Sequence, residues 1–291
     1  GQIGTYEKED VAAVLLHLKK NQDDYQAFVE KLQDESVTVG EEDGVQYLLL
    51  TDSNLRKMTG TEEPVKTVEA EIVTPTPTPE GNGKKVAIDA GHQAHGNSEQ
   101  EPIGPGASQT KAKVASGTTG RTTGVTEYQL NLDVSLKLRD ELEARGYEVY
   151  MIRETNDVDI SNAERAQLAA ESGADILVRI HANGSDNTSV AGALTMAPST
   201  ANPYLSQELI AEFQKLSQCI ITTFCASTGA NNQGVYQTDE MSGLNWCSIP
   251  ATIVEMGYMT NPDEDTRMQT AEYQQQMVTG IADGIDQYFA S

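Results

Sequence analysis

Two kinds of segment alternate regularly along the last two thirds of the chain. Short apolar runs rich in β-branched residues are typical of buried strands, and they occur at residues 85–90, 147–153, 174–182 and 250–259. Longer segments with apolar residues at helical spacing occur at residues 126–145, 160–173, 202–224 and 265–289. This alternation predicts an α/β fold, in which a mixed, mostly parallel sheet has helices on both faces.

A run of alternating Thr and Pro, followed by glycines, precedes this pattern. Such a run favours extended backbone and cannot form a packed core, so we interpret residues 74–83 as a linker. It divides the chain into a small N-terminal domain, residues 1–73, and a larger domain, residues 84–291. Helical periodicity predicts that the small domain is mainly helical, with one short strand within residues 45–52. We find no catalytic or metal-binding motif in this small domain.

Charge and cysteine content exclude several classes of partner and site. The formal net charge is −24, from 44 acids and 20 bases, which argues against nucleic acid or an anionic membrane as a partner. No stretch approaches the length of apolar residues that a transmembrane helix needs. Three irregularly spaced cysteines predict buried small side chains rather than disulfides or a thiolate zinc site. The first ten residues lack the pattern of a signal peptide, and we expect the start of a mature or trimmed form.

Three residues that can bind metal stand at or just past the last apolar residue of a predicted strand: His92, His181 and Glu255. In open parallel sheets, sites form outside the carboxyl ends of the strands. The helix of residues 126–145 begins at the same edge, which brings Glu127 into the group. We therefore expect two imidazoles and two carboxylates to converge there.

Two neutral histidines and one carboxylate are a common ligand set for catalytic zinc, which keeps one further position open for water. The metal lowers the pKa of that water towards about 7. The remaining carboxylate then acts as general base and later as proton donor to the leaving group. Calcium and magnesium prefer oxygen ligands, so zinc suits this set better.

Each member of the group also has an ordinary interpretation when it is taken alone. The histidines fit a loop and a packed strand, and Glu127 fits a helix N-terminus stabilised by the helix dipole. Glu255 is harder to explain in this way, because a charge inside an apolar strand needs a partner. Gly91 and Gly96 flank a second nearby histidine, His95, which we interpret as a rim residue rather than a ligand. Residues 95–124 are either a substrate-facing flap or an inert surface insertion.

Four motifs in this order, "VAIDAGH", "TEYQLNL", "ILVRIHAN" and "TIVEMGYMTNPDE", resemble the zinc-dependent N-acetylmuramoyl-L-alanine amidase family of the Amidase_3 type. The resemblance covers residues 84–291 and extends to "YEVYMIRETND" and to the Arg-bearing helix "ISNAERAQLAAESGADILV". It implies that three residues are the zinc ligands and one is the catalytic carboxylate: His92, Glu127 and His181, with Glu255 as the carboxylate.

The resemblance also suggests two substrate-binding candidates. Asn183 matches an Asn two residues after the second histidine. Arg179 departs from the family's usual Ser, and it either contacts substrate or holds a carboxylate. Asn261 matches an Asn in the loop after the glutamate, where a structural role is expected.

The implied reaction is hydrolysis of the amide that joins N-acetylmuramic acid to L-alanine in peptidoglycan, as in autolysins, with Zn²⁺ as cofactor. Peptidoglycan is extracellular in bacteria, so a secreted or cell-wall location follows. Two alternatives stay open: a zinc hydrolase of another amide, and a non-catalytic peptidoglycan-binding or regulatory relative. The second is disfavoured because all four reactive positions are filled. The stem preference, the physiological process and the partner of the N-terminal domain are not determined by the sequence.

Overall fold

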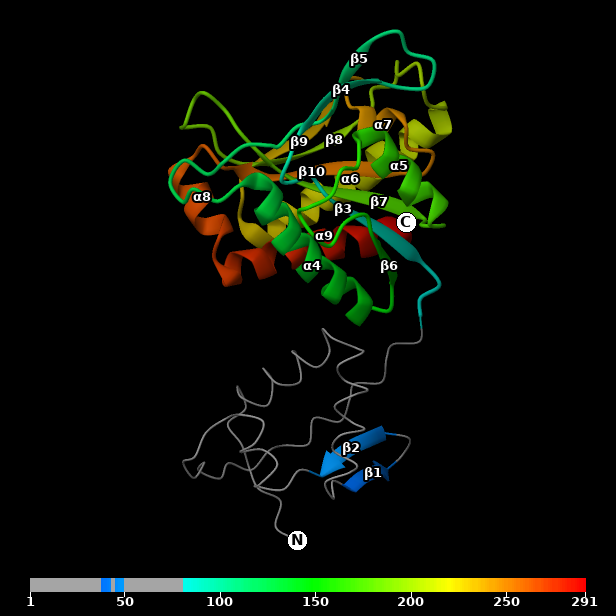
Figure 1. Cartoon of the computed structure of the whole chain (residues 1–291), viewed down its shortest axis with the longest axis vertical. Helices are drawn as coiled ribbons and strands as arrows, with labels where there is room; N and C mark the ends of the chain where they lie inside the picture. Colours follow the sequence, from blue (N-terminus) through cyan, green and yellow to red (C-terminus); the bar gives the residue numbers. More distant parts are fainter. Residues whose placement is uncertain (1–37, 43–44, 50–80) are drawn as a thin grey trace. The chain divides into compact units, whose positions relative to one another are not determined.

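The computed structural model describes residues 38–42, 45–49 and 81–291 (Figure 1). The chain divides into two units, residues 1–77 and residues 78–291, and each is considered by itself. In the first unit, strands β1 (Thr38–Glu42) and β2 (Val45–Leu49) form an antiparallel pair, and β2 lies where a strand is expected. The helices predicted for this unit lie outside the described residues, so the proposed domain at residues 1–73 stays a prediction.

A six-stranded sheet forms the centre of the second unit. Its strands, in spatial order, are β6 (Glu148–Met151), β3 (Lys85–Ala90), β7 (Ile176–Asn183), β10 (Ala251–Tyr258), β8 (Ala193–Ala197) and β9 (Asn232–Gln237). The first four are mutually parallel, whereas β8 is antiparallel to β10 and parallel to β9. The predicted mixed, mostly parallel sheet is confirmed.

Helices cover both faces of this sheet, as predicted (Figure 1). One face carries α4 (Glu127–Ala144), α6 (Gln207–Thr228) and α9 (Ala271–Phe289). The other carries α5 (Asn162–Glu171), the short α7 (Ser242–Asn245) and a hairpin of β4 (Asn97–Pro102) and β5 (Thr110–Val114). The remaining helix, α8 (Pro262–Met268), lies between β10 and α9 in the chain.

The strand pattern explains why two cores form. Alternate side chains of a strand point to opposite faces of the sheet. Ile88 and Val254 belong to the core beneath α4, α6 and α9, whereas Leu177 and Ile253 belong to the core beneath α5 and α7. Residues 179 and 181 lie two and four positions after Leu177, and residue 255 lies two positions after Ile253. Their side chains therefore point to the same face of the sheet as those of Leu177 and Ile253.

Sequence periodicity misses or misplaces several elements. Strands β8 and β9 are too polar or too short to be recognised, and the expected loop at residues 95–124 contains the β4–β5 hairpin. The expected single closing helix over residues 265–289 is wrong, because α8 ends at Met268 and Thr270 caps α9, accepting a hydrogen bond at its hydroxyl from the Tyr273 N–H.

The three cysteines have free thiols. The prediction that they are buried is confirmed for Cys247 and wrong for Cys219 and Cys225, which are partly exposed on α6. None of the helices in the described part of the chain is long and apolar enough to cross a membrane.

Close contact between α6 and α9 depends on two glycines one helical turn apart. A Cβ added to Gly280 would lie 2.7 Å from the Phe224 Cα, and one added to Gly284 would lie 2.5 Å from the Ile220 Cα. Because these obstacles are backbone atoms, a rotamer change cannot remove them. Thr223 Oγ1 donates a hydrogen bond to the Gly280 carbonyl at 2.7 Å across the same contact.

We expect Gly284→Val to lower the free energy of unfolding by about 2–3 kcal/mol or more, because the added side chain forces the two helices apart. Gln287→Val is the matched control, since residue 287 is exposed on the same helix and loses only about 0.5 kcal/mol of helix propensity. Urea unfolding of the isolated residues 78–291 and of the full chain measures both variants. Equal stability of the two variants would show that the helices do not touch at Gly284.

Candidate metal centre

Three elements bring His92, Glu127 and His181 together at the carboxyl edge of the sheet. His92 follows β3, Glu127 is the first residue of α4, and His181 lies near the end of β7. One ligand atom from each residue lies within 4.8 Å of the other two. The sequence predicted this convergence, because His92 and His181 stand at strand ends and Glu127 stands in the first turn of a helix.

The backbone of His92 adopts an unusual conformation that directs its ring to the site. Its φ is +60°, a region that residues other than glycine rarely occupy. Nδ1 of the ring lies 2.8 Å from the Ala115 carbonyl oxygen, so an N–H at Nδ1 donates to that oxygen. Nε2 is then the free ligand atom, and it lies 3.1 Å from Glu127 Oε1. A hydrogen bond of this kind fixes the tautomer of a metal-binding imidazole.

Glu127 links the other two residues through one carboxylate oxygen. Oε1 lies 3.1 Å from His92 Nε2 and 3.2 Å from His181 Nδ1, and Oε2 accepts a hydrogen bond from the Thr118 N–H at 2.9 Å. Burial acts to raise the pKa of Glu127, but hydrogen bonds and charge interactions with His181 and His92 outweigh it and hold the pKa well below its usual range. Glu127 is therefore ionised at neutral pH.

His181 is neutral and closely packed. Burial lowers the pKa of His181 to about 4, so its ring carries no charge near neutral pH. Nδ1 faces Glu127, whereas Nε2 is buried without a hydrogen-bond partner among the described residues. The ring lies against Gly91, where an added Cβ would come within 2.2 Å of it. Gly91 is thus required by this close approach, a reason that the sequence did not reveal.

The donor set fits zinc. Zinc–nitrogen and zinc–oxygen bonds of about 2.0–2.2 Å in a tetrahedron place neighbouring ligand atoms about 3.3 Å apart. The two contacts at Glu127 Oε1, 3.1 Å and 3.2 Å, are close to that spacing. A neutral imidazole with a lowered pKa and an ionised carboxylate are also the protonation states that a metal requires.

Glu255 lies beside this centre on the neighbouring strand. The β7–β10 register pairs it with His181, and parallel neighbours in register present their side chains on the same face. It is 9% exposed, and its Oε2 has no hydrogen-bond partner in the described part of the chain. Burial and then the charge of Glu127 raise the pKa of Glu255 to about 8. A buried carboxyl group with a perturbed pKa and a free oxygen is typical of a catalytic acid or base.

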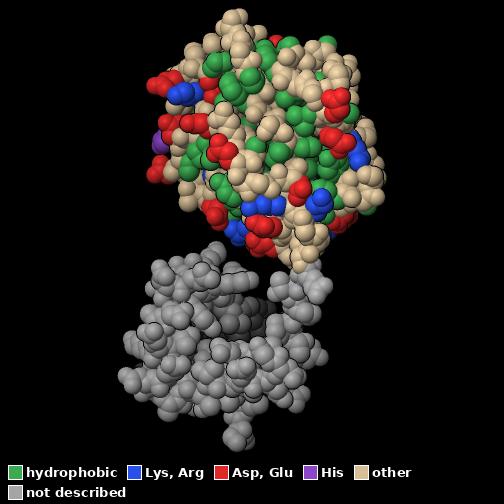
Figure 2. Space-filling view, turned by 90° about the vertical axis from the view of Figure 1, so that its right-hand side faces the viewer, with side chains coloured by type: hydrophobic (Ala, Val, Ile, Leu, Met, Phe, Trp, Pro, Cys, Tyr) green, Lys and Arg blue, Asp and Glu red, His purple; other side chains and the backbone are tan. Residues whose placement is uncertain are grey.

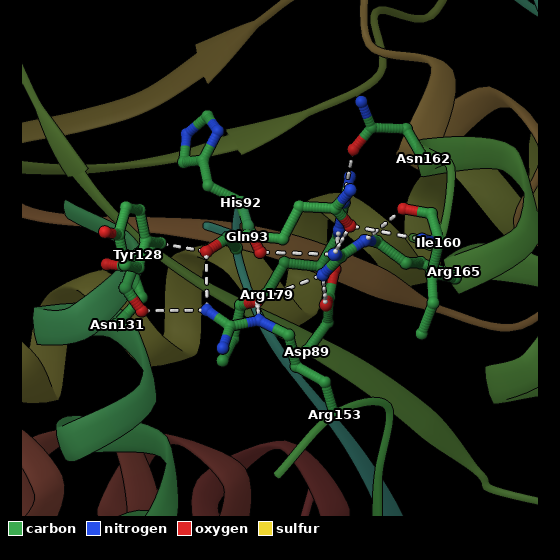
Figure 3. Close-up of polar contacts among 12 residues, drawn as sticks. Asp89, His92, Gln93, Tyr128, Asn131, Arg153, Ile160, Asn162, Arg165 and Arg179 are labelled. Carbon is green, nitrogen blue, oxygen red and sulfur yellow. Dashed lines mark hydrogen bonds and ion pairs between the residues drawn. The ribbon is translucent and has the colours of Figure 1, made fainter. Parts of the chain in front are cut away.

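Buried arginines hold the loop that carries His92 (Figure 3). Arg153 Nε donates to the Ala90 carbonyl at 2.6 Å, and its Nη2 donates to the Gly91 and Tyr128 carbonyls at 3.0 and 2.8 Å. Arg165 Nη2 donates to the His92 carbonyl at 3.1 Å. These bonds attach consecutive carbonyls of the loop to two side chains, which keeps the unusual backbone of His92 in place.

Arg179 and Arg165 share the buried carboxylate of Asp89. Arg165 Nη1 lies 2.6 Å from Asp89 Oδ1, and Arg179 Nε lies 2.8 Å from Asp89 Oδ2. Burial acts to raise the pKa of Asp89, but the charges of Arg165 and Arg179 outweigh it and hold the pKa well below its usual range. Of the two roles considered for Arg179, the structure has it holding a carboxylate; a contact with substrate stays a prediction.

The remaining candidates lie around this centre. Asn183, two residues after His181 on β7, is half-buried and accepts a hydrogen bond at Oδ1 from the Gly184 N–H. Its role in substrate binding stays a prediction. His95 is exposed, as expected of a rim residue. Asn261 caps α8, because its Oδ1 accepts from the backbone N–H groups of residues 263 and 264.

Sequence reasoning missed the residues that support the ligands. Asp89 carried the same signal as Glu255, a charge inside an apolar strand, and could have been found in that way. Gly117 carried no signal: its φ is +81°, and an added Cβ would meet Glu127 Oε2 at 2.7 Å and His92 Cδ2 at 2.9 Å. Its backbone therefore lies directly against two of the three candidate ligands.

Comparison with known proteins gives a consistent family assignment. Residues 86–287 match the family model described as N-acetylmuramoyl-L-alanine amidase. The N-acetylmuramoyl-L-alanine amidase LytC of Bacillus subtilis is 27% identical over 166 residues, which are 57% of this chain and 32% of that protein. The chain thus spans about a third of LytC. The N-acetylmuramoyl-L-alanine amidase Rv3717 of Mycobacterium tuberculosis is 26% identical over 72% of this chain and 88% of its own length.

Solved structures show the same fold. The N-acetylmuramyl-L-alanine amidase Ami1 of Mycobacterium smegmatis matches with a TM-score of 0.65 and 26% identity, over 72% of this chain and 97% of that chain. An N-acetylmuramoyl-L-alanine amidase from Clostridium difficile 630 matches with a TM-score of 0.58 and 27% identity, over 72% and 99%.

We expect Arg153→Met to weaken binding of Zn²⁺ about 10–100-fold, because the loop carbonyls lose their donors and His92 is no longer held in place. It should also lower stability by about 3 kcal/mol, since buried carbonyls are left unpaired. Zinc affinity is measured by competition with a chromogenic chelator, at a temperature where circular dichroism shows the variant folded. Arg139→Met, which removes an arginine with partly exposed ion pairs to Asp140 and Glu154, should leave the affinity unchanged. Unchanged affinity in folded Arg153→Met would disprove the positioning role.

Proposed function

This chain belongs to the N-acetylmuramoyl-L-alanine amidase family, and on that premise we propose that it is a zinc-dependent hydrolase of the amide bond between N-acetylmuramic acid and L-alanine in peptidoglycan. The observation that carries the proposal is the convergence of His92, Glu127 and His181 on one point, with Glu255 on the adjacent strand. A chain that had lost the activity but kept the fold would not need four reactive side chains at one sheet edge.

His92, Glu127 and His181 hold the zinc ion in this proposal, through Nε2, one carboxylate oxygen and Nδ1. When bound, zinc supplies Lewis acidity, which lowers the pKa of water towards about 7 and polarises the scissile carbonyl. The protein supplies the fixed positions of the ligands: the Ala115 carbonyl orients one imidazole, the Thr118 N–H orients the carboxylate, and burial keeps the other imidazole neutral.

Glu255 performs the proton transfers. Its Oε2 has no protein partner in the described chain, so it is available to accept a proton from the attacking water. The same oxygen then delivers the proton to the nitrogen of the departing L-alanine. Burial raises the pKa of Glu255, and a nearby cation would act in the opposite direction, so the carboxyl group can both take up and release a proton near neutral pH.

The proposed substrate places the protein outside the cytoplasm, secreted or associated with the cell wall. The Thr-Pro run at residues 74–83 suits an exported enzyme whose catalytic domain, residues 84–291, is tethered to a separate module. Residues 1–73 are then a partner-docking, regulatory or wall-proximal module. An autolytic role is part of the same proposal.

We expect Glu255→Gln to retain stoichiometric zinc and to lose about 10³-fold in turnover, because a neutral amide cannot accept the proton. His181→Ala should lose the metal. Zinc content is measured by atomic emission, and turnover is measured on a soluble muramoyl peptide. The control is Glu272→Gln, which makes the same change at an exposed carboxylate at the start of α9. Turnover near the wild-type rate in Glu255→Gln would remove it as the base, and full zinc occupancy in His181→Ala would remove that residue from the ligand set.

Products from purified peptidoglycan distinguish this activity from other zinc hydrolases. We expect one new L-alanine amino terminus for each bond cut, with glycan strands of unchanged length, because only the lactyl amide is hydrolysed. Amino-terminal labelling and mass spectrometry measure the first, and reducing-end assays measure the second. Amino termini other than L-alanine would indicate a different amide substrate. If the zinc-loaded protein produced no new amino termini, a peptidoglycan-binding or regulatory role would be favoured instead.

A further inference from the structure

One arginine differs from every other basic residue in the second unit. Within residues 81–291, each lysine and arginine except Arg121 has its side-chain nitrogen within hydrogen-bonding or ion-pairing distance of a protein oxygen. On the face shown in Figure 2, the basic side chains accordingly lie beside acidic ones. Arg121 is exposed and has no such partner among these residues.

The backbone that carries Arg121 is firmly held. Asp265 is fully buried, and its Oδ2 accepts hydrogen bonds from the N–H groups of Thr122 and Thr123 at 2.8 and 2.9 Å. The Thr123 hydroxyl donates to Oδ1 of the same carboxylate at 2.7 Å, and the Arg121 N–H donates to the Met259 carbonyl at 3.1 Å. A buried carboxylate is therefore used to fix the turn from which this arginine projects.

Arg121 lines a polar pocket of about 490 Å³. Its other polar side chains are four hydroxyls, from Thr118, Thr119, Ser185 and Thr260, and one carboxylate, from Asp186. Hydroxyls can donate hydrogen bonds to an anion, and a guanidinium matches a carboxylate with two parallel donors. The pocket is therefore suited to a small anionic group.

The pocket adjoins the candidate metal centre through two chain segments. Thr118 lines the pocket, and its backbone N–H donates to Glu127 Oε2 at 2.9 Å. Gly184 also lines it and directly follows Asn183, two residues beyond His181. An added Cβ at Gly184 would lie 3.3 Å from the Thr118 hydroxyl, so the two segments are in close proximity. A group bound in the pocket therefore lies close to the candidate metal centre, where the amide bond is cut in the proposed reaction.

We propose that Arg121 and the surrounding hydroxyls bind a free carboxylate on the peptide part of the substrate, so that the enzyme prefers muramoyl peptides bearing that carboxylate over those in which it is a primary amide. This inference rests on the proposed function, because it assumes a peptide joined to the amide that is hydrolysed. Arg121 offsets the repulsion between the acidic protein and an anionic peptide at the position where the peptide lies.

The test compares two muramoyl dipeptides whose chain-terminal carboxyl group is blocked as a methylamide and which differ only at the side group of the second residue, a carboxylate in one and a primary amide in the other. We expect kcat/KM of the wild-type enzyme to favour the carboxylate about tenfold, mainly through KM, because one partly exposed charge-assisted pair is lost with the amide. The preference should shrink as ionic strength rises. The ratio of kcat/KM for the carboxylate dipeptide to that for the amide dipeptide should fall to about one in Arg121→Gln, and the preference should be partly retained in Arg121→Lys.

Matched variants separate a local contact from a change in overall charge. Arg139→Gln removes the same charge from a paired arginine on α4 and should keep the wild-type preference. Asp186→Asn removes the carboxylate of the pocket itself and should raise the preference, since its repulsion of the substrate carboxylate is lost. Equal effects of Arg121→Gln and Arg139→Gln would mean that only net charge matters, which would overturn the inference.

Calorimetric binding of both dipeptides to zinc-loaded Glu255→Gln distinguishes the two proposals. If wild type cleaves both dipeptides equally, and adding Arg121→Gln to the Glu255→Gln protein leaves binding of both unchanged, the carboxylate subsite is wrong while the amidase proposal stands. If the zinc-loaded wild type cleaves neither dipeptide, the amidase proposal fails, and the binding measurement still tests the carboxylate subsite. Tighter binding of the carboxylate dipeptide that disappears with Arg121→Gln supports the subsite, and equal binding of the two dipeptides overturns it.

Discussion

A buried ion cluster beneath the candidate metal centre fixes the geometry on which the rest depends. The Asp89 carboxylate lies between Arg165 and Arg179, and all three side chains are almost completely removed from water. Removing the Asp89 carboxylate would leave two buried guanidinium groups without this counter-charge, which costs several kcal/mol, about 3–5 in comparable cases. The cluster joins β3, β7 and α5 at the edge where the strands end. It therefore ties the positions of two candidate ligands to each other through the protein interior.

Because this cluster holds β3, β7 and α5 together, the site can keep features that are energetically unfavourable. His92 has a left-handed backbone, Glu255 is buried without a polar partner for Oε2 among the described residues, and Glu127 is ionised although buried. The left-handed backbone and the unpartnered carboxyl oxygen cost free energy, whereas contacts with His181 and His92 offset the burial of the ionised Glu127. Strain of this kind persists only where the surroundings determine the conformation, and here the arginines supply that constraint.

Much of the site could be read from the sequence, because parallel strands place their carboxyl ends at one edge and His92, His181 and Glu255 each follow an apolar run. The supporting residues could not be read in the same way. Arg153 contacts backbone carbonyls rather than a side chain, and Gly117 matters through the absence of a side chain, so neither leaves a pattern at fixed spacing. Strands β8 and β9 escaped recognition because most of their residues are partly exposed or polar. The cap at Thr270 was missed because helical periodicity continues on both sides of it.

X-ray absorption spectroscopy of the purified, zinc-loaded protein tests the central claim most directly, because it reports the atoms bound to the metal. The account predicts nitrogen and oxygen neighbours at about 2.0–2.1 Å, with the multiple-scattering pattern of two imidazoles and no sulfur. The same spectrum from Glu127→Gln protein should show a changed first shell or no bound zinc. A sulfur neighbour at about 2.3 Å, a single imidazole, or a first shell unaffected by Glu127→Gln would contradict the assignment of His92, Glu127 and His181 as the metal centre.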